Sequence, residues 1–152
     1  MRAYALAAAM TVVLLLAAPA QASDGLRTVT GQFNVERTMN RLERLVRVAG
    51  FRVFARIDHS RAADRVGVRL PPVQLLIFGK PEAGSALMQS DPRIGIDLPM
   101  KFLVWRDTDG RTQIGWNQPE WLADRHRLSE RGPVLDRMNR TLEDLALQAA
   151  SE

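Results

Sequence analysis

Hydrophobic residues recur at helical spacing in some segments of the chain and at strand spacing in others, and this pattern predicts the order of its elements. Between residues 35 and 49, apolar side chains fall every three or four positions, which places them on one face of a helix. Asn34 precedes this segment as a candidate N-cap, and Gly50 follows it, where a helix commonly ends in the left-handed conformation. Residues 51–57 then alternate between apolar and polar side chains, as a strand does. With a strand over residues 26–33, we expect a β-α-β unit at the start of the domain.

The middle of the chain continues with shorter segments. Residues 60–64 are polar and form a candidate short helix. Residues 73–78 are nearly all apolar, which is typical of a central strand covered on both faces. Pro81 can then open a helix that runs through Met88, because proline is well tolerated in the first turn.

The last third of the chain contains a hairpin and two helices. Strands are expected over residues 102–105 and 112–116, and the Asp-Gly pair at 109–110 is a strong signal for a tight turn between strands. A short helix up to His126 and an amphipathic helix from Pro133 follow. We therefore predict an α+β fold with two layers, in which helices pack on a five-stranded mixed sheet in the order β-α-β-(α)-β-α-β-β-α-α.

The first 22 residues have the three parts of a secretory signal peptide. Arg2 gives a short positive region, residues 3–18 form an apolar run, and the Ala-Gln-Ala at 20–22 offers the small residues at which signal peptidase cleaves. The run is shorter than the roughly 20 residues that span a bilayer, so we expect no stable membrane span after cleavage and a periplasmic or secreted protein. The expected divisions are a signal peptide over residues 1–22, an α+β domain over residues 23–132 and a C-terminal amphipathic helix over residues 133–152.

Composition and charge exclude several classes of function. The chain has no cysteine, which excludes disulfides, thiol catalysis and metal sites built on thiolate. The net charge is +4, which is too mild to indicate a nucleic-acid partner. Arg37, Arg41 and Arg44 form a basic ridge on the first predicted helix, but no aromatic side chains lie between them for bases to stack on. We therefore expect no nucleic acid as a partner.

Five blocks of sequence occur together over most of the chain. They are residues 51–59 (FRVFARIDH), 75–81 (LLIFGKP), 84–88 (GSALM), 94–99 (IGIDLP) and 104–105 (VW). In this order the blocks resemble the family called domain of unknown function 302 (DUF302), with the similarity running over about residues 28–127. The resemblance implies a compact α+β domain, often a homodimer, with no agreed biochemical activity. The family usually shows Gly-Asn-Pro where this chain has Gly-Lys-Pro at 79–81, so a role for that asparagine does not carry over.

Asp58 and His59 stand at the end of a predicted strand, where sites gather in sheets with parallel connections. His126 is the only other histidine. If the fold brings His59 and His126 together with Asp58 or Asp97, these groups can hold a divalent metal or share a proton. The alternative is that both histidines are polar residues at the boundary of the core and that Asp58 caps the next segment. No cofactor is predicted beyond this divalent metal, because the spacing matches no known metal motif.

Gly79 and Lys80 join a predicted strand to the helix that Pro81 opens. A phosphate-loop motif is excluded, because the lysine follows the glycine directly and no Gly-Lys-Ser closes the loop. The helix start still offers backbone N–H groups that favour an anion, which makes Gly79 and Lys80 candidate ligand-binding residues. The alternative is a plain strand–turn–helix junction.

Three methionines raise a different possibility, because thioether sulfur selects Cu(I). They are Met88, Met100 and Met138. The chain has no Met-x-x-Met cluster, and methionine at helical spacing more often fills a core. We interpret these three residues as core.

No pair of residues in the sequence has the spacing of a nucleophile and its base, which favours binding over catalysis. Our first hypothesis is a non-enzymatic periplasmic binding or accessory protein for a small ligand or a metal, which we expect to be a homodimer. The candidate ligand-binding residues are Asp58, His59, Gly79, Lys80, Asp97 and His126. Two alternatives stay open: an enzyme with His59 as general acid or base, and a structural partner of another envelope protein that uses the last helix.

Overall fold

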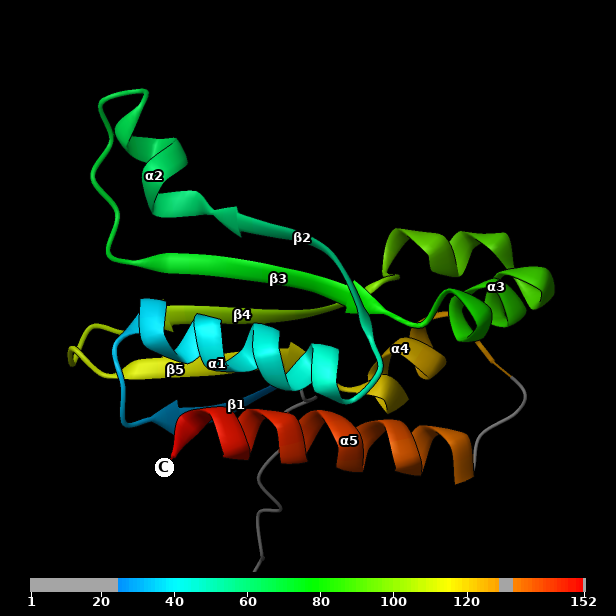
Figure 1. The fold of residues 1–152 in the computed structure, drawn as a ribbon. Coiled ribbons are helices and arrows are strands. Elements are labelled where there is room, and N and C mark those ends of the chain that lie inside the picture. Colours follow the sequence, from blue (N-terminus) through cyan, green and yellow to red (C-terminus); the bar gives the residue numbers. More distant parts are fainter. Residues whose placement is uncertain (1–24, 129–132, 152) are drawn as a thin grey trace, which may run out of the picture.

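The computed structural model describes residues 25–128 and 133–151, which form a five-stranded sheet with helices packed on it (Figure 1). The strands are β1 (Leu26–Gly31), β2 (Arg52–Asp58), β3 (Val73–Gly79), β4 (Met100–Arg106) and β5 (Thr112–Asn117). The helices are α1 (Val35–Val48), α2 (His59–Asp64), α3 (Pro81–Ser90), the 3-10 helix η1 (Pro92–Ile96), α4 (Pro119–Arg125) and α5 (Pro133–Ala150). This order confirms the predicted one and adds η1 between α3 and β4. Within the two described ranges, no helix is both long enough and apolar enough to cross a membrane.

The strands lie in the order β1-β5-β4-β3-β2, and every neighbouring pair is antiparallel. The expected mixed sheet is therefore wrong, although the two-layer α+β class is confirmed. β1 and β2 run in the same direction, but three strands lie between them, so α1 connects the two edges of the sheet (Figure 1). Hydrophobic periodicity identifies a strand without identifying its partner, and here β5 pairs with β1.

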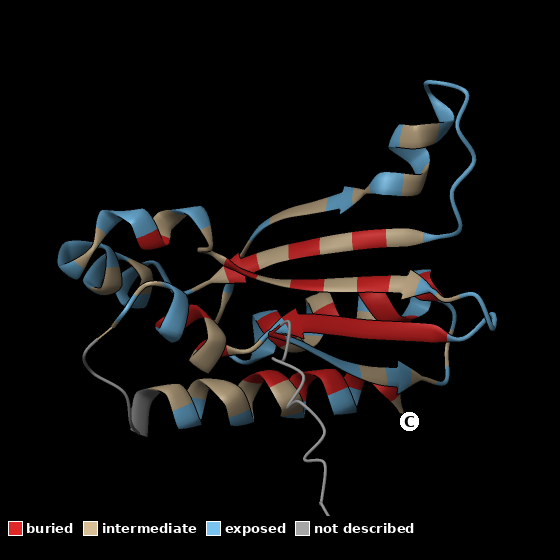
Figure 2. Ribbon diagram, turned by 180° about the vertical axis from the view of Figure 1, so that it is seen from behind, coloured by how far each residue is buried: buried red, intermediate tan, exposed pale blue. Residues whose placement is uncertain are grey.

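The core lies between one face of the sheet and the helices α1 and α5, which pack side by side against it (Figure 1). Phe102 of β4 stacks on Phe78 of β3, with ring centroids 5.0 Å apart. Phe102 also meets Trp116 of β5 edge to face, at a centroid distance of 5.9 Å. Leu42 of α1 and Leu142 of α5 close this core from the helical side, and both are buried. Figure 2 shows buried positions, in red, along the strands and in the part of α5 near the C-terminus.

The opposite face of the sheet is apolar but less buried than the core face. Along β3 the burial alternates, so that Leu76 and Phe78 are fully buried whereas Leu75 and Ile77 are half-buried. The prediction that residues 73–78 form a central strand is confirmed. The expectation that the strand is covered on both faces is wrong, because α1 and α5 lie on the same side of the sheet.

The last helix, α5, is part of the same helical layer. Its residues Leu142, Leu145 and Ala146 are buried in the common core, and its end is tied to β1 by a hydrogen bond from the backbone N–H of Gln32 to the carbonyl of Ala150, 2.8 Å. The amphipathic face that the sequence predicts from residue 133 is therefore used inside the domain.

Local signals in the sequence correspond closely to the structure. The side chain of Asn34 caps α1 by accepting a hydrogen bond from the backbone N–H of Arg37, at 2.9 Å. Gly50 follows the end of α1 with a φ of 77°, and Gly110 in the β4–β5 turn has a φ of 78°. Both backbone conformations favour glycine, because other residues pay a steric cost there.

A polar network holds α1 against the edge strand β2. The side-chain amide of Gln74 donates to Glu36 at 2.7 Å, and its oxygen accepts from the Arg56 guanidinium at 2.7 and 3.0 Å. Arg56 also forms an ion pair with Glu36 at 2.9 Å. These contacts hold the pKa of Glu36 below its ordinary value, and the hydrogen bond from Gln74 has the largest effect.

The Gln74→Leu variant is expected to be less stable than the wild type by about 0.5–1 kcal/mol at pH 7, the size of one net hydrogen bond. Because the pKa of Glu36 is lower in the folded chain, its contribution is present above its usual pKa and is lost as the pH falls through the folded value. The difference between variant and wild type should therefore narrow between pH 7 and pH 3. Urea unfolding followed by circular dichroism measures this difference in the free energy of unfolding. If the difference does not change with pH, this role of Glu36 is contradicted.

Candidate functional site

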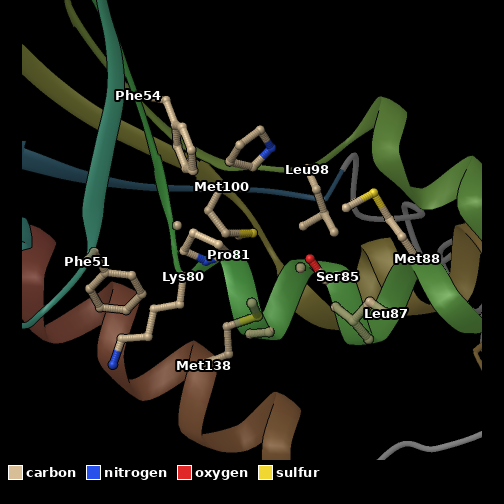
Figure 3. A pocket seen from close by; sticks show the side chains of 14 residues that line it. Phe51, Phe54, Lys80, Pro81, Ser85, Leu87, Met88, Leu98, Met100 and Met138 are labelled. Carbon is tan, nitrogen blue, oxygen red and sulfur yellow. The ribbon is translucent and has the colours of Figure 1, made fainter.

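A pocket opens where β3 ends and α3 begins, and we call it the α3 pocket (Figure 3). It has a volume of about 330 Å³, which is within the range of small-molecule sites. Its walls are formed mainly by apolar side chains from five parts of the chain. They include Phe51, Phe54, Leu87, Leu98, Met100 and Met138.

The local sequence explains why this space is open. A register shift in the β2–β3 pairing between Val53 and Ala55 leaves Phe54 outside the ladder, and its ring faces the pocket (Figure 3). Gly79 allows close packing at the base, because a Cβ there would lie 3.3 Å from Cβ of Pro99. α3 forms the outer wall, and none of its residues is buried. An apolar helix that covers a cavity without filling it leaves room for a ligand.

Among the described residues, only two polar side chains line the α3 pocket, one just before α3 and one within it. Lys80 precedes the helix, and its Nζ lies 4.8 Å from the centre of the Phe51 ring. Figure 3 shows the lysine side chain extending past this ring at the side of the pocket. Ser85 lies one turn further along the helix. The structure thus places the predicted pair Gly79 and Lys80 directly in the wall of the pocket.

Asp58 and His59 lie at the other end of the sheet (Figure 1). Asp58 is paired with Gln74, five residues before Gly79, which corresponds to about 17 Å at the usual strand rise. Asp58 caps α2 by accepting from the backbone N–H of Arg61 at 2.9 Å, and this hydrogen bond, more than any other contact, lowers its pKa. His59 is exposed at the first position of α2. The premise of a site at the end of a parallel strand does not hold, because this sheet is antiparallel.

Asp97 and His126 form a third, separate pair. His126 Nε2 lies 2.5 Å from Asp97 Oδ2, and the two side chains are only 8% and 11% exposed. Arg125 adds a contact of 3.3 Å to the other carboxylate oxygen. The Lys101 ammonium donates to the carbonyls of Asp97 and Pro99 at 2.7 and 2.8 Å, and burial lowers the pKa of Lys101. Together these contacts fix the segment from η1 to β4, which forms one wall of the α3 pocket.

The two histidines are not brought together. His59 begins α2, and His126 ends α4, at opposite ends of the sheet (Figure 1). In the part of the chain that the structure describes, no group of three or more histidine, aspartate or glutamate side chains is placed to hold a metal. The structure therefore offers Asp97 and His126 as a buried pair that holds two segments together, and it separates this pair from Asp58 and His59.

Sequence reasoning did not predict the α3 pocket itself. It interpreted Met88, Met100 and Met138 as core, whereas the structure places all three around this one cavity. They come from α3, β4 and α5, and no local pattern links elements so far apart in the chain. One signal was available, because residues 81–90 contain apolar side chains and a glycine but no strong amphipathic pattern.

Comparison with known proteins gives a family and a fold. A family model described as "Domain of unknown function DUF302" matches residues 27–145. This match extends into α5, beyond the domain boundary that was expected at residue 132. The crystal structure of an uncharacterized conserved protein DUF302 from Bacillus stearothermophilus is similar, with a TM-score of 0.66 over 84% of this chain and 97% of that one. At 21% sequence identity, this similarity shows the fold alone.

Curated relatives of this chain carry a functional name. Fluoride-specific ion channel FluC 1 of Brucella suis biovar 1 (strain 1330) is 42% identical over 105 residues, which cover 69% of this chain and 41% of that protein. FluC 1 of Brucella abortus biovar 1 (strain 9-941) is also 42% identical over 105 residues and is covered to 39%. The chain thus spans about two fifths of the length of these relatives.

Proposed function

The chain belongs to the DUF302 family, and we propose that it is a non-enzymatic binding domain whose small ligand enters the α3 pocket. The observation that carries this proposal is the pocket itself, which combines a volume of about 330 Å³ with apolar walls from five parts of the chain. Large apolar pockets with few polar groups are the usual sites for small molecules. Burial of a ligand against Phe54, Leu98 and Met100 would supply most of the binding free energy.

The polar groups at the pocket support binding over catalysis. Lys80 and Ser85 are the only polar side chains that the described residues contribute to its walls, and Lys80 contacts the Phe51 ring rather than the serine. A nucleophile would need a base within hydrogen-bond reach and a third group to orient that base. The alternative of an enzyme that uses His59 as general acid or base has less support, because His59 is exposed on α2 at the far end of β3.

Titration calorimetry with 1-octanol tests the proposal. The protein is expected to bind one molecule with a dissociation constant of about 0.1–1 mM, which corresponds to roughly 0.5 kcal/mol for each non-hydrogen atom of the ligand. The change in heat capacity on binding should be negative, because burial of apolar surface produces a change of that sign. Heats that do not saturate, or no heat at any temperature, would remove the support for a binding domain.

A second proposal comes from the Brucella relatives. Their chains are more than twice as long as the matched part, and their name is that of a fluoride-specific ion channel. We propose that this chain has an accessory role for such a channel. Cells that express the channel with and without this chain can be compared for growth in fluoride. An equal tolerance of fluoride in both would argue against the accessory role.

We also propose that the protein is exported to the periplasm or secreted, and that residues 1–22 are its signal peptide. Those residues lie outside the described part of the chain, so the support is their sequence alone. Fractionation of cells that express the full chain, with mass spectrometry of its N-terminus, tests both statements. A cytoplasmic protein that retains residues 1–22 would contradict them.

The less buried face of the sheet supports the proposal of a homodimer. Leu75, Ile77, Leu103 and Trp105 lie there on two neighbouring strands, and all four are half-buried. A second copy that covers these side chains would bury apolar surface that a lone domain leaves in contact with water. Sedimentation velocity should show a dimer for the wild type and a monomer for Leu103→Glu. A monomeric wild type at all concentrations would exclude this interface.

A further inference from the structure

The ligand of the α3 pocket can be specified further, on the premise that the pocket binds a ligand at all. We propose that it takes a small anionic amphiphile, with an apolar body of about eight to ten atoms in the pocket and a carboxylate or similar group bound by the ammonium of Lys80. Three features of the pocket support this ligand class: its size, the polarity of its walls and the position of the Lys80 ammonium.

The size of the pocket sets the length of the apolar body. A cavity of about 150 Å³ lined by apolar side chains holds one benzene molecule. The α3 pocket has about twice that volume and is partly open to solvent. It therefore suits a medium-length alkyl chain or a bicyclic aromatic group, whereas the full tail of a membrane phospholipid would extend far beyond it.

The walls of the pocket set the charge of the ligand. Of the residues that the structure describes, Lys80 is the only charged one that lines the pocket, and none of the described lining residues is a carboxylate that could receive a cationic ligand. Within the described residues, Lys80 forms no ion pair, and its ammonium contacts the face of the Phe51 ring. That contact holds the ammonium near the pocket but uses none of its hydrogen-bond donors in the way an oxygen acceptor would.

The other lysine of the chain shows the contrast. The Lys101 ammonium donates to two backbone carbonyls at 2.7 and 2.8 Å and lies outside the walls of the α3 pocket. Lys80 has no such acceptor among the described residues, so an anion placed beside it would gain donors without displacing any of them. The apolar body of the ligand would at the same time remain against Phe51 and Phe54.

Calorimetry with octanoate and 1-octanol on three proteins tests this inference. They are the wild type, Lys80→Gln and the control Arg65→Gln, which removes the same charge from an exposed position beyond α2, at the opposite end of the sheet. Lys80→Gln is expected to weaken octanoate binding by about three- to tenfold, the range of an ion pair partly exposed to water. It should change octanol binding by less than about twofold, and Arg65→Gln should leave both affinities unchanged.

The results separate this inference from the proposed function. If octanol binds but Lys80→Gln leaves octanoate binding unchanged, the anionic class is overturned and the binding domain is retained. An equal loss of octanoate affinity in Arg65→Gln would also overturn it, since the effect would then follow from net charge alone. If neither compound binds the folded wild type, both proposals are wrong. Raising the salt concentration to 0.5 M should lower the affinity of the wild type for octanoate, because screening weakens an exposed ion pair.

Discussion

Replacement of Phe102 by alanine is expected to lower the free energy of unfolding by about 3–5 kcal/mol, the usual cost of removing a buried aromatic ring. Phe102 is fully buried between the Phe78 ring at 5.0 Å and the Trp116 ring at 5.9 Å. Its loss removes both ring contacts and leaves a cavity in the centre of the sheet. Since domains of this size are stable by about 5–15 kcal/mol, the variant should be close to unfolding.

Urea unfolding followed by circular dichroism measures this effect. Phe54→Ala is the matched control, because Phe54 is also an aromatic residue near β3 but is 45% exposed. Phe54→Ala is expected to lower the free energy of unfolding clearly less than Phe102→Ala does. Phe102→Leu retains most of the volume and should cost less than half as much as the alanine variant, which keeps the comparison measurable if the alanine variant does not fold. If Phe54→Ala and Phe102→Ala lower the free energy of unfolding equally, the assigned position of the core is contradicted.

The Gly84→Leu variant is expected to weaken octanol binding by tenfold or more while the domain becomes slightly more stable. Gly84 lies in α3 and lines the α3 pocket, and a Cβ there would meet only Cδ1 of Leu98, at 3.9 Å. A leucine side chain would therefore extend into open space and occupy the site. Glycine inside a helix is less favourable than other residues by about 0.5–1 kcal/mol, so the fold should gain stability from the change.

Calorimetry and thermal unfolding together test this prediction. Gly84→Ala is the control, because it adds one methyl group, gives the same gain in helix propensity and leaves most of the pocket free. It should bind octanol within about twofold of the wild type. Binding by Gly84→Leu that equals that of Gly84→Ala would show that the ligand does not enter the α3 pocket.

The sequence predicts the elements of this fold well because their signals are local. Asn34 and Gly50 mark the two ends of α1, and Gly110 marks the hairpin turn, each through a backbone conformation or a cap that a few neighbouring residues determine. The sheet order depends on pairing between distant segments. The β-α-β pattern at the start of the domain favours parallel neighbours, but β1 pairs with β5, about 85 residues away along the chain.

The same difference between local and distant information applies to the candidate site. Gly79 and Lys80 were identified from a strand–turn–helix junction, and the structure places both in the wall of the pocket. Asp58 and His59 were chosen from a rule for parallel sheets, and the antiparallel order places them at the other end of β3. The three methionines around the pocket could not be grouped from the sequence, because only the packing of α3, β4 and α5 brings them together.

A titration of the protein labelled with 13C at the methionine methyl groups tests most directly whether a ligand occupies the α3 pocket. Met88, Met100 and Met138 line the pocket, whereas Met39 is fully buried in the core on α1 and is absent from the pocket walls. With increasing octanoate, the three pocket methyl signals should shift together along one saturating curve while the Met39 signal stays in place. Pocket signals that do not shift, or a Met39 signal that shifts as much as they do, would contradict a ligand site at this position.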